Sequence, residues 1–296
     1  MSRQSKTVLV PGGQGWVGQR FVRHLEERGM NPLPLSRREV DYTQSKLLKE
    51  VIKDTGASFL INCAGYTGKP NVDACELHKA ECLEGNAVLP GVIREVCEDL
   101  GLPWGHVSSG CIYSGNGPDG LGFRESDLPN FSFRQGPCSF YSGTKALGEE
   151  ILEGADRCFI WRLRIPFDNL DFPRNYLSKV LTYHRLLEAR NSLSHLDEFV
   201  KAACDGWVNE VEFGVYNLTN PGSITTSRVV ELARKHLPTD KEFSFFDSEE
   251  QFLKEAAKTP RSNCVLNTDK AREAGLVMRP VEEAVIDSFK NWRSAG

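Results

Sequence analysis

An apolar strand, regularly spaced glycines and an amphipathic helix follow one another at the start of this chain, and their order most constrains how it can fold. The apolar run covers residues 6–11. Glycine then recurs at every third position, at Gly12, Gly15 and Gly18, and an apolar-periodic segment covers residues 15–28. Glycines in such a turn let the backbone approach a phosphate, and the N-terminus of the following helix carries partial positive charge. The segment therefore predicts a dinucleotide site on a parallel α/β sheet.

The first half of the chain continues to alternate short apolar runs with helical patterns. We expect strands at residues 8–11, 32–35, 59–62, 104–108 and 158–165, and helices at about residues 15–28, 44–54, 72–100 and 139–154. Pro90 lies inside the third helical pattern and predicts a kink or a break, because proline lacks the N–H that a helix interior needs. This rhythm is typical of a doubly wound parallel sheet that binds ligands at the carboxyl ends of its strands.

The regular alternation of strand and helix patterns ends at Pro166. We expect residues 1–165 to form an NADP-binding Rossmann domain and residues 166–296 to form mainly a smaller substrate-binding lobe. In the second part, a strand at residues 214–218, a helix at 225–236 and a last helix at about 280–293 are separated by irregular polar sequence. Some of these segments are expected to return to the first domain.

Composition excludes several classes of protein. The 296 residues carry a net charge of −4 with no basic block, which argues against a nucleic-acid or membrane-surface partner. Residues 1–6 are polar and run directly into a core strand, so no signal peptide is expected, and no apolar run approaches the roughly 20 residues that span a bilayer. Nine cysteines without a CxxC pair argue against a disulfide framework and a structural zinc site. We expect a cytoplasmic protein with a small-molecule partner and no metal.

Tyr141 and Lys145 stand four residues apart in a helical pattern and therefore lie on the same helix face. A nearby cation stabilises phenolate, so the tyrosine can exchange a proton with a sugar or alcohol oxygen near neutral pH. Ser109 follows the strand at residues 104–108, where its hydroxyl is placed to bond the same substrate oxygen.

The order Ser109, Tyr141, Lys145 resembles the catalytic triad of the short-chain dehydrogenase/reductases, and the glycine spacing is similar to that of their extended branch. The resemblance implies that Tyr141 is the general acid and that Ser109 polarises the carbonyl. Lys145 would lower the pKa of the tyrosine and bind the nicotinamide ribose. Asn86 resembles the helix asparagine that this family uses to order its site.

The second strand ends in Ser36-Arg37-Arg38, at the position where an NAD-specific site would place an acidic residue on the ribose. The two-nitrogen fork of an arginine can pair with a 2′-phosphate, so NADPH is favoured over NADH, although the nearby Glu39 weakens this preference. The candidate cofactor-binding residues are Gly12, Gln14, Gly15, Trp16, Val17, Gly18, Ser36, Arg37, Asp41, Asn62, Ala64, Gly65, Asn86 and Lys145.

Four further segments carry a narrower resemblance. They are residues 62–73 (NCAGYTGKPNVD), 109–113 (SGCIY), 173–179 (PRNYLSK) and 260–263 (PRSN). In this order they resemble the bifunctional nucleotide-rhamnose synthases, which join 3,5-epimerase to 4-reductase activity, and less closely dTDP-4-dehydrorhamnose reductase. The chain departs from that family in its Pro-Gly-Gly-Gln start of the phosphate loop and in Ser109, which stands in place of a threonine.

The narrower resemblance implies a nucleotide-linked 4-keto-6-deoxy sugar as substrate, inverted at C3 and C5 and then reduced at C4. Inversion beside a ketone needs one group that removes a proton and another that delivers one to the opposite face. Cys111 and Lys179 match the positions assigned to that work, and a thiol near a lysine can become thiolate. The candidate substrate-binding residues are Lys69, Asn71, Asn175, Arg261 and Asn263. A homodimer and a functional coupling to a 4,6-dehydratase are also expected.

The leading prediction is an NADPH-dependent enzyme that converts UDP-4-keto-6-deoxyglucose to UDP-β-L-rhamnose. The alternatives are a simple dTDP-4-dehydrorhamnose-type reductase and an enzyme like GDP-fucose synthase, although no histidine aligns with Lys179 as the latter would require. A non-catalytic subunit like the regulatory subunit of methionine adenosyltransferase is a third alternative, against which Tyr141, Lys145 and Cys111 argue. The six histidines show no ligand spacing and are expected to be structural or on the surface.

Overall fold

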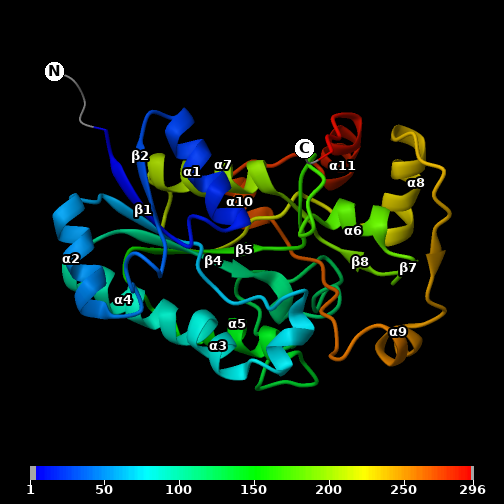
Figure 1. Cartoon of the computed structure of the whole chain (residues 1–296), viewed down its shortest axis with the longest axis horizontal. Coiled ribbons are helices and arrows are strands. Elements are labelled where there is room, and N and C mark those ends of the chain that lie inside the picture. Colours follow the sequence, from blue (N-terminus) through cyan, green and yellow to red (C-terminus); the bar gives the residue numbers. More distant parts are fainter. Residues whose placement is uncertain (1–4, 295–296) are drawn as a thin grey trace.

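The computed structural model describes residues 5–294, and its centre is a six-stranded parallel sheet (Figure 1). The strands lie in the order β10-β5-β4-β3-β1-β2. They are β1 (Thr7–Pro11), β2 (Asn31–Leu35), β3 (Phe59–Asn62), β4 (Trp104–Ser109), β5 (Cys158–Leu163) and β10 (Gly214–Asn217). The expected doubly wound α/β fold is confirmed. The order reverses between β1 and β3, and sheets of this kind bind ligands outside the carboxyl ends of the strands at such a point.

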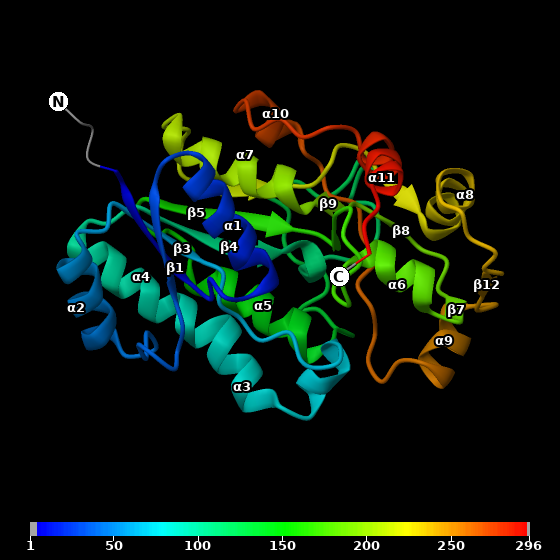
Figure 2. The same cartoon turned by 45° about the horizontal axis from the view of Figure 1, so that its top comes forward.

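Helices cover both faces of the sheet (Figure 2). One face carries α1 (Trp16–Glu27) and α7 (Leu196–Val208), and the other carries α2 (Ser45–Thr55), α4 (Leu89–Leu100) and α5 (Phe140–Ile151). Because successive side chains of a strand point to opposite faces, Val8 and Val10 pack with α1 and α7, whereas Leu9 packs with α2 and α4. Burial on both faces explains why the strands are almost entirely apolar. No helix between residues 5 and 294 is long and apolar enough to cross a membrane.

The helical pattern at residues 72–100 is irregular just before Pro90. It consists of the 3₁₀ turn η1 (Val72–Glu76), helix α3 (Lys79–Leu83), the π-helical turn η2 (Glu84–Val88) and helix α4. Pro90 lies in the first turn of α4, where its missing N–H is tolerated, and the wider turn precedes it. The helix is continuous from α3 to α4, so the irregularity expected at Pro90 is a π-helical turn with Asn86 at its centre rather than a break.

The second half of the chain divides between the main sheet and a smaller cluster of helices. Strand β10 pairs with β5 at the edge of the main sheet, and α7 packs on α1. The other elements are η3 (Gly110–Ile112), β6 (Pro166–Phe167), α6 (Tyr176–Thr182), β7 (Arg185–Leu186), β8 (Arg190–Asn191), β9 (Ser194–His195), β11 (Ile224–Thr225), α8 (Thr226–His236), β12 (Ser244–Phe245), α9 (Glu249–Glu255), α10 (Asp269–Glu273) and α11 (Val281–Lys290). Phe167, Leu177, Val229 and Phe289 belong to the core of the smaller cluster. The domain boundary at residue 165 stays a prediction.

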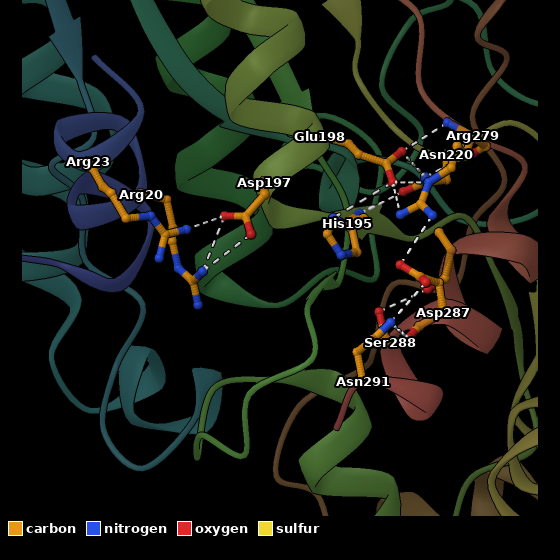
Figure 3. A network of polar contacts seen from close by, with 11 residues as sticks. Arg20, Arg23, His195, Asp197, Glu198, Asn220, Arg279, Asp287, Ser288 and Asn291 are labelled. Atoms are coloured by element: carbon orange, nitrogen blue, oxygen red, sulfur yellow. Dashed lines mark hydrogen bonds and ion pairs between the residues drawn. The ribbon is translucent and has the colours of Figure 1, made fainter. Parts of the chain in front are cut away.

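Charged side chains connect α1 to the second half of the chain (Figure 3). Arg20 of α1 is buried, and its guanidinium contacts Asp168 at 2.5 Å and Asp197 of α7 at 3.1 Å. On the same helix α7, Glu198 pairs with Arg279 at 2.6 Å. Burial raises the pKa of Asp168, and the charge of Arg20 opposes that rise. The helix after the glycine loop is thereby tied to the chain segment that leads into α6.

Candidate active site

The glycine loop after β1 is pressed against the loop after β3. Gly12 has a φ of +75°, and a methyl group built on it would lie 2.6 Å from the amide nitrogen of Ala64. A methyl group on Gly18 would clash with the carbonyl oxygen of Gly12. Gly15 begins α1 without a side-chain cap, so the first amides of this helix remain available to an anion. The loop thus fits the pyrophosphate of a dinucleotide at the point where the strand order reverses.

Gln14, Trp16 and Val17, which neighbour the glycines, all make contacts within the chain. The ring of Trp16 stacks on Phe172 with the centroids 5.6 Å apart. Val17 packs against the core between α1 and the sheet, and the carbonyl of Gln14 accepts a hydrogen bond from Gln19 at 3.1 Å. The side chains of Trp16 and Val17 and the backbone of Gln14 therefore help to shape the loop, and the contact of these residues with a cofactor stays a prediction.

The residues after β2 also have partners in the chain. Arg37 pairs with Glu84 at 2.8 Å, and the Ser36 hydroxyl accepts from the amide of Arg38. The carboxylate of Asp41 accepts from Thr43 and Gln44, and the hydrogen bond from Thr43 is the main cause that lowers the pKa of Asp41. A 2′-phosphate at Arg37 would compete with Glu84 for the guanidinium.

Two buried asparagines order the loop that follows β3. The Oδ1 of Asn62 accepts from the amide of Ala64 at 3.1 Å. Asn86 accepts from the amide of Tyr66 at 2.9 Å and donates to the Tyr66 carbonyl at 2.8 Å. A methyl group on Gly65 would lie 3.0 Å from the Oδ1 of Asn86, so the loop and the π-helical turn are in close contact.

Ser109, Tyr141 and Lys145 come together at the carboxyl end of β4. Helix α5 begins beside this strand end and carries Tyr141 in its first turn and Lys145 one turn later. The hydroxyl of Ser109 lies near the phenol of Tyr141 and lowers its pKa. Lys145 is buried, and its Nζ donates to the carbonyl of Val107 at 3.1 Å and lies 3.4 Å from the Nε2 of His106.

Burial is the main influence on the protonation of this group. Burial raises the pKa of Tyr141 well above its ordinary value, and the hydroxyl of Ser109 only partly opposes that rise. Lys145 is not among the main influences on the phenol, and the expected lowering of the tyrosine pKa by the lysine stays a prediction. Burial also lowers the pKa of Lys145. Both effects have one cause, the removal of a charged form from water.

Cys111 and Lys179 have pKa values shifted in opposite directions. Cys111 is buried in η3, and its amide donates to the hydroxyl of Ser109 at 3.2 Å. Burial raises the pKa of its thiol, although Ser109, Arg164 and Lys145 oppose the rise. The expectation that the thiol becomes thiolate beside a lysine is therefore wrong at neutral pH. Lys179 lies on α6, and burial lowers the pKa of its ammonium. Cys111 is thus a proton donor, and Lys179 is an amine that loses its proton readily. Their placement on opposite faces of one substrate stays a prediction.

Two candidate substrate-binding residues, Asn71 and Arg261, both contact Asp73 of η1. Arg261 forms a two-nitrogen contact with Asp73 at 2.7 and 2.8 Å, and this pair joins the 258–263 segment to η1. Asn71 accepts from the amide of Asp73 and so begins that turn. Lys69, just before it, is exposed.

The amides of the two remaining candidates are also used within the chain. Asn175 is fully buried, donates to Asp168 and to the carbonyl of Leu170, and accepts from the amide of Leu177 at 3.0 Å. Its observed role is to begin α6, so it has no spare donor for a sugar. The Oδ1 of Asn263 accepts from Asn191 at 3.1 Å.

Two polar residues near Lys145 are absent from the sequence-based candidates. His106 lies on β4 beside the lysine, and Glu149 lies behind it on α5, paired with Arg162 at 2.7 Å. Both are buried or nearly so. A histidine inside an otherwise apolar strand is a usable signal, because a buried polar side chain needs a partner. Within residues 5–294, no three His, Cys, Asp or Glu side chains are placed to hold a metal ion.

The sequence matches the family model of the RmlD substrate binding domain over residues 6–294. It is 31% identical over 290 residues to a bifunctional dTDP-4-dehydrorhamnose 3,5-epimerase/dTDP-4-dehydrorhamnose reductase of Arabidopsis thaliana, covering 96% of this chain and 93% of that protein. It is also 31% identical over 289 residues to a trifunctional UDP-glucose 4,6-dehydratase/UDP-4-keto-6-deoxy-D-glucose 3,5-epimerase/UDP-4-keto-L-rhamnose-reductase of the same plant. That match covers 96% of this chain but only 42% of the longer relative.

Two solved structures share the fold. The UDP-rhamnose synthase of Acanthamoeba polyphaga mimivirus superposes with a TM-score of 0.89 at 24% identity, over 97% of this chain and 100% of that one. The dTDP-4-dehydrorhamnose reductase of Bacillus anthracis, in complex with NADP, superposes with a TM-score of 0.81 at 17% identity, over 98% of this chain and 99% of that one. At these identities the similarity establishes the fold alone.

Proposed function

This chain belongs to the RmlD substrate binding domain family, and we propose that it is an NADPH-dependent 3,5-epimerase/4-reductase that converts UDP-4-keto-6-deoxyglucose to UDP-β-L-rhamnose. The observation that carries the proposal is the meeting of two sets of groups at the end of β4. Ser109, Tyr141 and Lys145 provide for reduction, and Cys111 stands two residues beyond Ser109 for epimerisation.

The glycine loop is the proposed cofactor site. Gly12 and Gly18 leave the space that a side chain would fill, and the first amides of α1 would hold the pyrophosphate. Arg37 would reach the 2′-phosphate by exchanging its contact with Glu84. Support for NADP comes from the Bacillus anthracis reductase, which was solved with it. When bound, NADPH supplies the hydride that reduces the C4 ketone.

Lys179 and Cys111 are the proposed acid–base pair of the two inversions. The amine of Lys179 takes the proton from C3 or C5, so that a C–H bond breaks, an N–H bond forms and an enolate conjugated to the C4 oxygen remains. The thiol of Cys111 then gives its proton to the same carbon from the opposite face and becomes thiolate. Proton exchange with solvent restores both groups. The lowered pKa of the lysine and the raised pKa of the thiol suit these directions of transfer.

Tyr141 is the proposed acid of the reduction. Because burial keeps its phenol protonated at neutral pH, it holds a proton to give to the C4 oxygen as the ketone is reduced. Ser109 donates to the same oxygen and orients it. Lys145 lies one helical turn from Tyr141 and offsets the negative charge of the phenolate that forms.

The nucleotide is proposed to be UDP. The trifunctional plant relative and the mimiviral synthase carry UDP in their names, whereas the bifunctional plant relative carries dTDP. We also propose a functional coupling to the 4,6-dehydratase that makes the substrate, because the name of the trifunctional relative includes that activity. The homodimer stays a prediction.

The test is NMR of the product formed from UDP-4-keto-6-deoxyglucose and NADPH in deuterated water. An L-rhamnose product with deuterium at C3 and C5 would support both inversions and the reduction. A 6-deoxy-D-sugar without the label would leave a simple reductase. No turnover with UDP-, dTDP- or GDP-linked ketones, together with co-purification with a larger enzyme, would favour a non-catalytic subunit.

A further inference from the structure

Residues 168–175 form a connecting segment between β6 and α6, the helix that carries the proposed base of the inversions. Its first residue, Asp168, is fully buried, and no step of the chemistry proposed above uses it. One carboxylate oxygen of Asp168, Oδ2, contacts the guanidinium of Arg20 on α1 at 2.5 Å. The other, Oδ1, accepts from the side-chain amide of Asn175 and from the backbone amide of Leu170, each at 2.9 Å. The carboxylate therefore lies between α1 and the start of α6.

Asn175 connects this carboxylate to the proposed base. Its Nδ2 donates to the backbone carbonyl and to the carboxylate of Asp168, each at 2.9 Å. Its Oδ1 accepts from the amide of Leu177 at 3.0 Å, and its own carbonyl accepts from the amide of Lys179 at 3.1 Å. The backbone of Lys179 is thus bonded to Asn175, and the side chain of Asn175 is bonded to Asp168.

A second path joins the same two helices through the connecting segment. The hydroxyl of Ser178 on α6 accepts from the amide of Phe172 at 2.9 Å. The ring of Phe172 stacks on Trp16, the first residue of α1, with the centroids 5.6 Å apart. The segment therefore contacts each helix at two positions. It fixes α6 relative to the helix whose first amides are proposed to hold the cofactor.

Only a carboxylate at position 168 can serve both helices. The groups that bond to its oxygens, on Arg20, Asn175 and Leu170, are all donors, and an ionised carboxylate offers acceptors alone. Burial raises the pKa of Asp168, and the amide of Leu170 and then the charge of Arg20 oppose that rise. An amide side chain has a single acceptor oxygen. Its NH₂ group would face another donor, on one helix or on the other.

We propose that Asp168 is a positioning residue for the inversions, because its carboxylate holds α6 against α1 and so places Lys179 at the sugar that the cofactor reduces. The inference rests on the proposed function, in which Lys179 removes the protons at C3 and C5. Proton removal and hydride transfer act on one sugar ring, so the base and the cofactor must keep a fixed separation. A misplacement of about 1 Å costs about 10²-fold in rate. Loss of the carboxylate slows inversion more than reduction, because the reducing groups lie on β4 and α5.

The test compares Asp168→Asn with Asp197→Asn in the full chain, well below the melting temperature of each variant. Both changes remove a carboxylate that contacts Arg20, but Asp197 lies on α7, is 43% exposed and also pairs with Arg23 (Figure 3). Deuterium uptake at C3 and C5 measures the base, and NADPH oxidation with a pre-epimerised ketone, at saturating NADPH, measures the reduction. Asp168→Asn should lower kcat for uptake about 10- to 10²-fold and change kcat for reduction by less than about twofold. Asp197→Asn should leave both rates unchanged.

Asn175→Ser tests the same connection without leaving a buried charge unpaired. Serine keeps an oxygen that can cap α6, but it has no amide to donate to Asp168. This variant should also lower kcat for uptake about tenfold while reduction continues. Amide hydrogen exchange of Lys179, measured by NMR without substrate, should become about tenfold faster in Asn175→Ser and Asp168→Asn and should stay unchanged in Asp197→Asn.

Unslowed uptake in Asp168→Asn would overturn the inference, since the carboxylate would then only stabilise the fold. Equal losses of uptake and reduction would overturn it as well, because the effect would not belong to the base. If the wild-type protein turns over no keto-sugar, the proposed function alone is refuted, and amide exchange still tests the connection. Exchange that is faster only in Asp168→Asn and Asn175→Ser supports the connection between Asp168 and α6, and unchanged exchange refutes it.

Discussion

Glu149 and Glu150 are neighbours on α5, and each forms an ion pair with an arginine, but only one pair is buried. Glu149 lies 2.7 Å from Arg162, and the two side chains are 9% and 5% exposed. Glu150 lies 2.7 Å from Arg134, and these side chains are 35% and 76% exposed. Glu149 also accepts a hydrogen bond from Ser108, directly before the proposed catalytic serine. The two positions therefore allow a buried ion pair to be compared with an exposed ion pair of the same 2.7 Å length.

Glu149→Gln should destabilise the protein far more than Glu150→Gln. The first change leaves the guanidinium of Arg162 buried without a counter-charge, which costs about 3–5 kcal/mol. The second removes an exposed pair worth about 0–1 kcal/mol. For a chain of 296 residues, an unfolding entropy of about 2.1 cal/mol/K per residue makes 1 kcal/mol equal to about 1.6 °C. The expected drops in Tm are about 5–8 °C and less than about 2 °C.

Scanning calorimetry at neutral pH measures both drops directly. The double variant Glu149→Gln/Arg162→Met should recover part of the loss, because no unpaired charge remains in the core. Equal drops for Glu149→Gln and Glu150→Gln would refute the reasoning. So would a double variant less stable than Glu149→Gln, since the penalty would then come from lost packing instead of an uncompensated charge.

Three further predictions concern the site. Cys111→Ser should slow inversion at C3 and C5, measured as formation of the L-sugar, by about 10²–10⁴-fold while reduction of a pre-epimerised ketone continues, and an unchanged rate of inversion would remove the thiol from the mechanism. Gly12→Ala should weaken NADPH binding at least about tenfold by fluorescence titration, whereas Gly29→Ala, which has a similar positive φ but open space around its Cβ, should bind normally. Deuterium uptake should increase as pH rises through the pKa of Lys179, because only the neutral amine takes a proton, and burial places that pKa below the ordinary value of a lysine. Lys179→Met should abolish this increase with pH. An increase that persists in Lys179→Met would identify another base.

The strands and the motifs at their ends could be predicted because each depends on a short stretch of sequence. The apolar run of β1 is unambiguous and the glycines follow it directly, whereas the Tyr141–Lys145 spacing is recognisable within one helical pattern. Helix α7 shows the limit of local patterns. Leu196, Phe199 and Ala203 recur at helical spacing, but no side-chain cap marks the start of this helix. The sequence alone therefore predicts no helix here, whereas α1, which also lacks a side-chain cap, is marked by the glycine loop before it.

The electrostatics of the site could not be predicted because they depend on residues that are distant in sequence. Arg261 is an evident cation, but its partner Asp73 lies 188 positions away. The contact between His106 and Lys145 follows from how β4 packs against α5. The raised pKa of Tyr141 likewise reflects burial by the whole fold. Residue types at the site were therefore predictable, and their charge states were not.

The placement of β10 and α7 bears on how this protein can be divided or transplanted. A fragment ending at residue 165 would contain every sequence motif of the proposed cofactor site. It would nevertheless lack the strand that pairs with the edge of β5 and the helix that covers Phe159 and Trp161 on one face of the sheet. An open strand edge beside an uncovered apolar face favours aggregation. A portable unit must therefore extend at least through β10, which ends at Asn217.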